Sequence, residues 1–117
     1  MKDDKIYLIH ILESIEKIEN FLRKKRQISD IDEIVEDAIV KNLQNMAEST
    51  QRLSPSLKLT VRDIPWQEIS DFRNKLVHDY LGTSMSIVYD VIKTDLPKLK
   101  KRVTKMIEFL EKKEKNS

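Results

Sequence analysis

The sequence predicts an all-α protein that folds as an antiparallel four-helix bundle, with residues 1–117 forming a single domain. Glycine occurs once and proline three times, so the turn residues that a sheet protein needs are scarce. Charged residues make up 36% of the chain and aromatic residues 6%, as in amphipathic helices. Apolar residues recur at steps of three and four, which is the period of one helix face. Short connections between such helices favour an antiparallel bundle.

The first two helices are predicted from two apolar stripes. The first stripe consists of Leu8, Ile11, Ile15, Ile18 and Leu22. This helix is expected to end at the basic residues 23–26, whose positive charge suits a helix C-terminus. The second helix starts within residues 29–32, where several polar side chains can cap it. Its apolar positions are Val35, Ala38, Leu43, Met46 and Leu53. Residues 54–65 break the pattern and are predicted to form the longest loop.

The third and fourth helices follow that loop. The third helix is expected to begin at Pro65 and Trp66, because proline suits a first helical turn, and to end before Gly82. Its apolar seam consists of Ile69, Phe72 and Leu76. The last helix opens near residues 83–84 and carries the repeat Ile92, Leu96, Leu99, Val103, Met106 and Leu110. Pro97 interrupts this repeat, so we expect a kink or a break there.

Several classes of site are disfavoured by composition. The chain has no cysteine, which removes disulfides, thiolate zinc sites and cysteine nucleophiles. The first ten residues carry acids where a secretory signal is basic, and no apolar run reaches the length of a membrane span. We therefore expect a soluble, cytoplasmic protein without membrane contact.

The net charge of +2 conceals an uneven distribution of charge. Residues 30–37 contain five acids and no base, whereas residues 93–115 contain nine Lys and Arg against four acids. A second basic cluster lies at residues 23–26. Such clusters are usually solvated helix faces, but they are also what an RNA backbone contacts.

An unusual group of side chains lies in DFRNKLVHDYLG, residues 71–82. Arg73, His78 and Tyr80 fall within eight residues there. On an ideal helix Arg73 and Tyr80 lie within about 20° of each other, whereas His78 lies about 140° from Arg73. For the three to act on one substrate, either the helix unwinds near His78 or a second copy of the chain completes the site.

The spacing of these residues, R-x4-H-x-Y, resembles the signature of HEPN domains, small four-helix ribonucleases common among prokaryotic toxins. More narrowly, the chain is similar to the HepT-like subgroup in IPWQEISDFRNKLVHDYLG, where Pro-Trp precedes Arg-Asn and the motif ends in His-Asp-Tyr. The second helix of the subgroup is similar to AIVKNLQNMAESTQRLSP, although many members have Gly-Glu-Ala where residues 47–49 read Ala-Glu-Ser. Its final helix is similar to IVYDVIKTDLPKLKKRV, so the resemblance spans residues 5–113.

The resemblance implies a metal-independent endoribonuclease acting on cellular RNA, either tRNA or mRNA. The ribose 2′-hydroxyl attacks the adjacent phosphate and leaves a 2′,3′-cyclic phosphate. Histidine titrates near neutral pH, so His78 can serve as the general base or acid. Arg73 can bind the phosphate oxygens as charge builds in the transition state. Tyr80 can position the phosphate, and Asn74 can orient His78 or bind RNA.

The resemblance also implies partners and regulation. The chain would be the toxin of a type II toxin–antitoxin system, inhibited when a minimal nucleotidyltransferase antitoxin transfers AMP from ATP onto Tyr80. Motifs of two subunits would meet at a homodimer cleft, alone or in a higher assembly with the antitoxin. No cofactor and no metal site are expected, although a carboxylate-bound magnesium ion stays open. The alternative is a non-catalytic helical subunit that docks on a nucleotidyltransferase and helps to bind its substrate.

Three further residues have an ordinary structural interpretation. His10 lies on a strongly amphipathic helix and is expected to be partly exposed surface without a role. Trp66 is interpreted as a core anchor for the long loop rather than a platform for base stacking. Glu48 is near enough to reach the cleft as a polar neighbour, but a helix-surface acid is the favoured interpretation.

Overall fold

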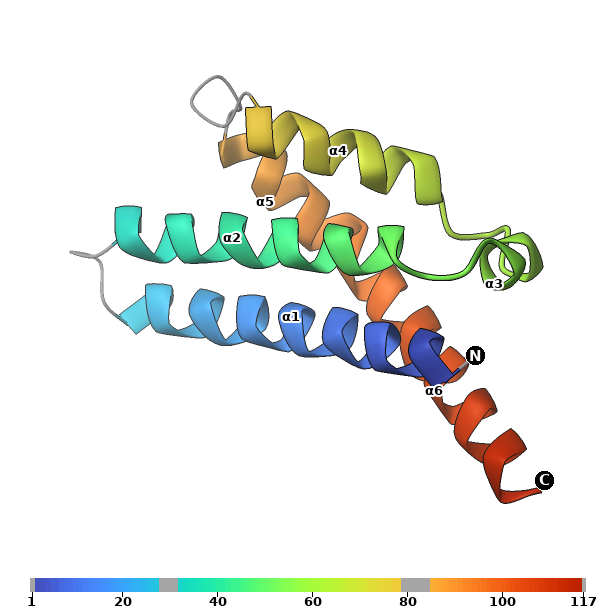
Figure 1. Cartoon of the computed structure of the whole chain (residues 1–117). Coiled ribbons are helices and arrows are strands. Elements are labelled where there is room, and N and C mark those ends of the chain that lie inside the picture. Colours follow the sequence, from blue (N-terminus) through green and yellow to red (C-terminus); the bar gives the residue numbers. More distant parts are fainter. Residues whose placement is uncertain (1, 28–31, 79–84, 117) are drawn as a thin grey trace.

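The computed structural model describes residues 2–27, 32–78 and 85–116, and all regular elements in these ranges are α-helices. The helices are α1 (Lys2–Gln27), α2 (Asp32–Gln51), α3 (Pro55–Thr60), α4 (Trp66–His78), α5 (Met85–Thr94) and α6 (Leu96–Lys115). In Figure 1, α1 and α2 run antiparallel side by side, and α4 runs antiparallel along α2. The predicted all-α class is confirmed. Within these ranges no helix is long and apolar enough to span a membrane.

The core lies where α1 packs on α2 and α6, and it is built from the predicted stripes. In α1 the fully buried positions are Leu8, Ile11, Ile15 and Ile18. The other helices contribute Leu43, Leu76 and Val103, which are at most 1% exposed. Burial of each such side chain stabilises the fold by about 1.5–3 kcal/mol. The spacing of apolar residues therefore predicted most of the core. In α2, however, the predicted Ala38 is only partly buried, whereas Ile39 and Val40, which were not predicted, are buried.

The segment predicted as one long loop, residues 54–65, contains the short helix α3, so that prediction was wrong. The hydroxyl of Ser54 accepts the backbone N–H of Leu57 at 3.2 Å, and Pro55 occupies the first turn. This Ser-Pro pair is a strong start signal for a helix. Ser54 also donates its hydroxyl and backbone N–H to the buried Asp4 carboxylate, at 2.7 and 2.8 Å. Asp4 thereby fixes the start of α3 to α1.

The predicted break near Pro97 is confirmed. α5 ends at Thr94, and α6 begins at Leu96 with Pro97 in its first turn. Proline is tolerated there because a first-turn N–H has no intrahelical acceptor. With α3 and this break, the described ranges hold six helices where four were predicted. The expected boundaries at Ser29, Gly82 and Thr83 lie outside the described residues.

The bundle is elongated and open on one side. Its extents are 52 × 28 × 21 Å, and its radius of gyration is 15.1 Å. A compact domain of this length has a radius of gyration of about 13 Å. α4 packs on α2 and α6 packs on α1, but α4 and α6 make few contacts with each other. In Figure 1 the C-terminal end of α6 extends beyond the other helices.

Candidate functional site

Arg73 lies in α4 on the side that faces α2. Its side chain is 24% exposed, and its Nη2 donates to the Glu48 carboxylate of α2 at 3.2 Å. Its Nη1 donates to Oδ1 of the neighbouring Asn74 at 3.2 Å. The Nε atom is buried and has no hydrogen-bond partner among the described residues. Arg73 is therefore a half-buried, oriented guanidinium whose Nε has no partner in the described part of the chain.

Two hydrogen bonds from α2 position the helix that carries Arg73. Gln44 donates its side-chain N–H to the backbone carbonyl of Leu76 at 3.3 Å, and Gln51 donates to the Ser70 hydroxyl at 3.0 Å. Gln44 thereby joins the last turn of α4 to α2. Leu76 itself is fully buried. Arg73 is thus flanked by two contacts between α4 and α2.

His78 and Asn74 lie on the exposed side of α4. The helix continues through His78, its last residue. From Arg73, five residues of helix advance about 7.5 Å and turn about 140°. Of the two possibilities left open by the sequence, unwinding of the helix before His78 is not observed. A single chain therefore does not bring Arg73 and His78 to one point. Tyr80, the third motif residue, lies outside the described residues.

The structure bears differently on the predicted roles of four nearby or singled-out residues. Asn74 bonds to Arg73, so its predicted part in orienting His78 stays a prediction. Glu48, interpreted as a surface acid, pairs with Arg73; the two are 25 positions apart, and no local spacing could indicate this contact. Trp66 is confirmed as an anchor, since its indole N–H donates to the Val61 carbonyl at 2.9 Å. His10 is exposed, as expected.

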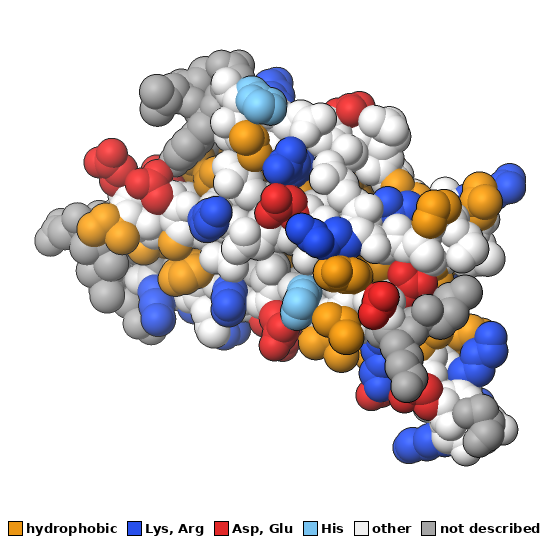
Figure 2. Space-filling model, in the orientation of Figure 1, with side chains coloured by type: hydrophobic (Ala, Val, Ile, Leu, Met, Phe, Trp, Pro, Cys, Tyr) orange, Lys and Arg blue, Asp and Glu red, His pale blue; other side chains and the backbone are white. Residues whose placement is uncertain are grey.

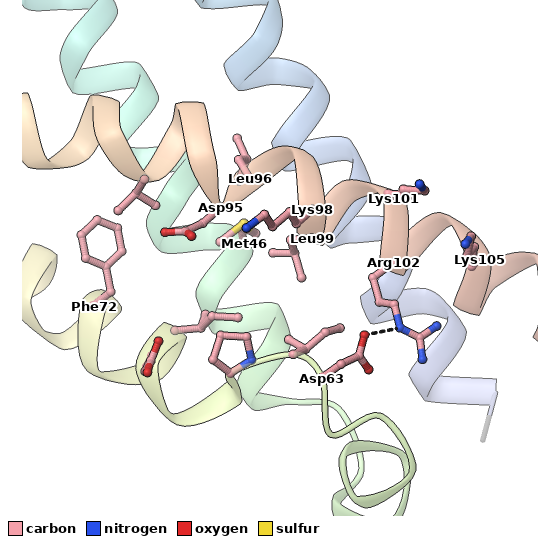
Figure 3. A pocket seen from close by; sticks show the side chains of 15 residues that line it. Met46, Asp63, Phe72, Asp95, Leu96, Lys98, Leu99, Lys101, Arg102 and Lys105 are labelled. Carbon is pink, nitrogen blue, oxygen red and sulfur yellow. Dashed lines mark hydrogen bonds and ion pairs between the residues drawn. The ribbon is translucent and has the colours of Figure 1, made fainter.

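A groove of about 510 Å³ opens between α4 and α6 (Figure 3). Its apolar lining includes Phe72 of α4 and Leu96 and Leu99 of α6. Phe72 precedes Arg73, and adjacent helical residues point about 100° apart, so the groove lies on another side of α4 than the Arg73 guanidinium. This groove could not be predicted from local spacing, because four helices and the segment before α4 combine to form it.

One ion pair spans the groove. The Arg102 Nε donates to the Asp63 carboxylate at 2.8 Å (Figure 3). This hydrogen bond lowers the pKa of Asp63 below its ordinary value of 3.8. The contact joins α6 to the segment before α4, and it closes one end of the groove.

Charges of both signs are interspersed over the face shown in Figure 2, which displays no extended patch of one sign. Within the described ranges, no three His, Asp or Glu side chains gather in a group that could hold a metal ion. The candidate site therefore consists of the α4 motif and its polar neighbours on α2.

Comparison with known proteins matches this site to a family. A family model described as Ribonuclease HepT-like matches residues 11–106, a range that includes Arg73, His78 and Tyr80. The chain is 34% identical over 116 residues to a protein of Methanocaldococcus jannaschii named "Gamma-glutamylcyclotransferase and putative RNase". That alignment covers 98% of this chain and 52% of the relative, so the chain spans about half of that protein.

Other relatives are matched along nearly their whole length. The chain is 30% identical over 106 residues to the "Probable ribonuclease HepT" of Thermococcus cleftensis, covering 90% of this chain and 96% of the relative. A second Methanocaldococcus jannaschii protein, also named as an RNase, is 29% identical over 117 residues, covering 99% and 97% of the two chains. No solved structure matches the chain significantly.

Proposed function

The chain belongs to the HepT-like ribonuclease family, and on that premise we propose that it is a metal-independent endoribonuclease that cleaves cellular RNA. The observation that carries this proposal is the intact R-x4-H-x-Y motif, with Arg73 held half-buried against α2 and His78 exposed on the same helix. Arginine binds phosphate oxygens through its planar fork, and histidine transfers protons near neutral pH. These are the two groups that RNA cleavage by the 2′-hydroxyl requires.

In the proposed reaction, His78 removes the proton of a ribose 2′-hydroxyl, and the 2′-oxygen forms a bond to the adjacent phosphorus. The bond from phosphorus to the 5′-oxygen breaks, which leaves a 2′,3′-cyclic phosphate. The leaving 5′-oxygen takes a proton from water, and His78 afterwards releases its proton to water. Arg73 stabilises the negative charge that grows on the phosphate oxygens.

This reaction needs Arg73 and His78 at one phosphate, so we propose that the site is shared between two subunits. The support is the unbroken helix through His78, which directs the two side chains of one chain about 140° apart. A two-fold homodimer with its α4 motifs face to face supplies the missing partner from the second chain.

The direct test is substitution of the two motif residues. His78→Ala and Arg73→Ala should each abolish RNA cleavage, whereas His10→Ala, a change at the other exposed histidine, should retain it. Melting temperatures should change little, because His78 is exposed and the partly exposed Arg73–Glu48 ion pair contributes at most about 1 kcal/mol. Full activity of either motif variant contradicts the assignment. A wild-type chain that cleaves no RNA supports the docking-subunit alternative.

We further propose that the chain is the toxin of a toxin–antitoxin pair and that a nucleotidyltransferase antitoxin inhibits it at Tyr80. The Tyr80 oxygen attacks the α-phosphorus of ATP, pyrophosphate leaves, and the phenolic proton passes to a base of the antitoxin. The support is the motif spacing, which places Tyr80 within about 20° of Arg73 on a continued helix. The added phosphate can then neutralise Arg73 and occupy its phosphate site.

Intact-mass measurement tests this regulation. After incubation with the antitoxin and ATP, the wild type should gain AMP, and Tyr80→Phe should not. The variant should also escape inhibition of RNA cleavage. AMP that still attaches to Tyr80→Phe places the modification on another residue.

A further inference from the structure

One face of α6 carries exposed lysines that the proposed reaction does not use. These side chains, called the lysine row below, are Lys98, Lys101, Lys105, Lys112 and Lys113. On an α-helix they fall within an arc of about 120° and extend over about 22 Å. Figure 3 shows the first three projecting from α6 at the rim of the groove. Arg102 lies in the same arc, but Asp63 neutralises it.

No carboxylate forms an ion pair with the lysine row among the described residues. Two acids in the second half of α6, Glu111 and Glu114, approach Lys5 of α1 at 3.7 and 3.1 Å. Glu108 lies at the edge of the arc without an ion pair to the row. By contrast Lys100, on another side of α6, pairs with Glu19 at 2.8 Å. The row therefore presents uncompensated positive charge to solvent.

An aromatic ring interrupts the row. Phe109 lies in the same arc between Lys105 and Lys112, and 64% of it is exposed. The Lys113 ammonium lies 5.9 Å from its ring centroid. The ion pairs of Glu111 and Glu114 with Lys5 of α1 lie on another side of α6, so Phe109 and the lysines around it point away from α1. An exposed ring between cations is what proteins use to bind single strands, by base stacking and phosphate contacts.

We propose that the lysine row and Phe109 form a second RNA-binding surface, separate from the α4 motif, which holds single-stranded substrate by its phosphates while Phe109 stacks on a base. The choice of RNA rests on the proposed function. An acidic protein fits this surface less well, because protein interfaces have an apolar core and the row offers one exposed apolar side chain, Phe109. Five phosphate contacts spread over about 22 Å would add affinity without touching the reacting bond.

Charge removal with a matched control tests the surface. The row variant combines Lys101→Gln, Lys105→Gln and Lys112→Gln. The control removes the same charge at exposed lysines on other helices, through Lys17→Gln, Lys41→Gln and Lys93→Gln. Binding is measured by fluorescence anisotropy with labelled 2′-O-methyl RNA of about 20 nucleotides, which lacks the attacking hydroxyl and so reports binding independently of cleavage.

The salt dependence of this binding gives the quantitative result. Each lysine on a single-strand phosphate contributes about 0.7 to the slope of log affinity against log salt. The slope of log affinity against log salt should therefore be shallower by about 2 in the row variant than in the wild type. In the control triple the slope should change much less. Phe109→Ala should weaken single-strand binding by about fivefold or more and leave duplex RNA binding unchanged. Equal losses in the row variant and the control overturn the proposal.

Two further outcomes separate this surface from the catalytic site. Cleavage of a short oligonucleotide that cannot reach α6 should keep its kcat in the row variant, while the KM for long RNA rises. If the wild type cleaves nothing but the row variant still loses RNA affinity, the proposed function fails and the surface stands. Unchanged RNA affinity together with lost binding to an acidic peptide or to anionic vesicles overturns the RNA assignment.

Discussion

The shared site can be tested by mixing two inactive variants. Arg73→Ala and His78→Ala are each expected to be inactive as homodimers. Random re-association of equal amounts makes about half of the dimers mixed. If each site takes Arg73 from one subunit and His78 from the other, a mixed dimer has one site with both changes and one intact site. The mixture should then recover about one quarter of the wild-type rate.

The assumption that each site is shared between two subunits follows from the helix geometry. Because α4 stays helical through His78, the two side chains of one chain diverge by about 140°, and the proposed pairing between chains would bring them together. RNA cleavage is assayed after partial unfolding and refolding of the mixed variants, with each variant treated alone as the control. If native mass spectrometry shows that mixed dimers have formed but the mixture stays inactive, the shared site is refuted and both residues act from one chain.

Two smaller predictions concern the polar neighbours of the site and of the groove. Glu48→Gln should tighten RNA binding by up to about fivefold, since an exposed ion pair worth up to about 1 kcal/mol no longer competes for Arg73; weaker binding would show that Glu48 instead holds Arg73 in its productive orientation. Asp63→Asn should lower the melting temperature at neutral pH. The folded-state pKa of Asp63 is depressed below 3.8, so its contribution is present above that pH and is lost as the pH falls further. The difference between the melting curves of wild type and variant should therefore close in acid, and a difference that persists there would contradict the role of this ion pair.

The core and the helix starts could be predicted from the sequence because they depend on local spacing. Leu8, Ile11 and Ile15 recur with the helical period, and the structure buries them completely. Pro97 predicted the break before α6 for a similar reason, since a proline in the middle of a helix removes a hydrogen bond. The same local reasoning, applied to Ser54 and Pro55, would have predicted α3.

The environment of Arg73 could not be predicted in the same way. Its contact with Glu48 depends on how α4 lies along α2, and no periodicity within either helix determines that arrangement. The groove has the same origin, since Phe72 and Leu99 come from helices that hardly contact each other. The basic cluster of residues 93–115 was visible as composition, but the structure was needed to show which of its lysines remain without a carboxylate.

The contrast between Arg73 and the lysine row suggests how the proposed enzyme divides its work. In the free chain, Glu48 already neutralises Arg73, so a ground-state phosphate with one negative charge gains little by displacing that carboxylate. As the 2′-oxygen attacks, negative charge accumulates on the phosphate oxygens, and their attraction for the guanidinium rises while that of Glu48 does not. Arg73 then contributes more to the transition state than to substrate binding, which is the condition for raising kcat rather than lowering KM. Affinity for the RNA substrate in its ground state then has to come from cations without a competing carboxylate. Among the described residues, the lysine row on α6 provides such cations.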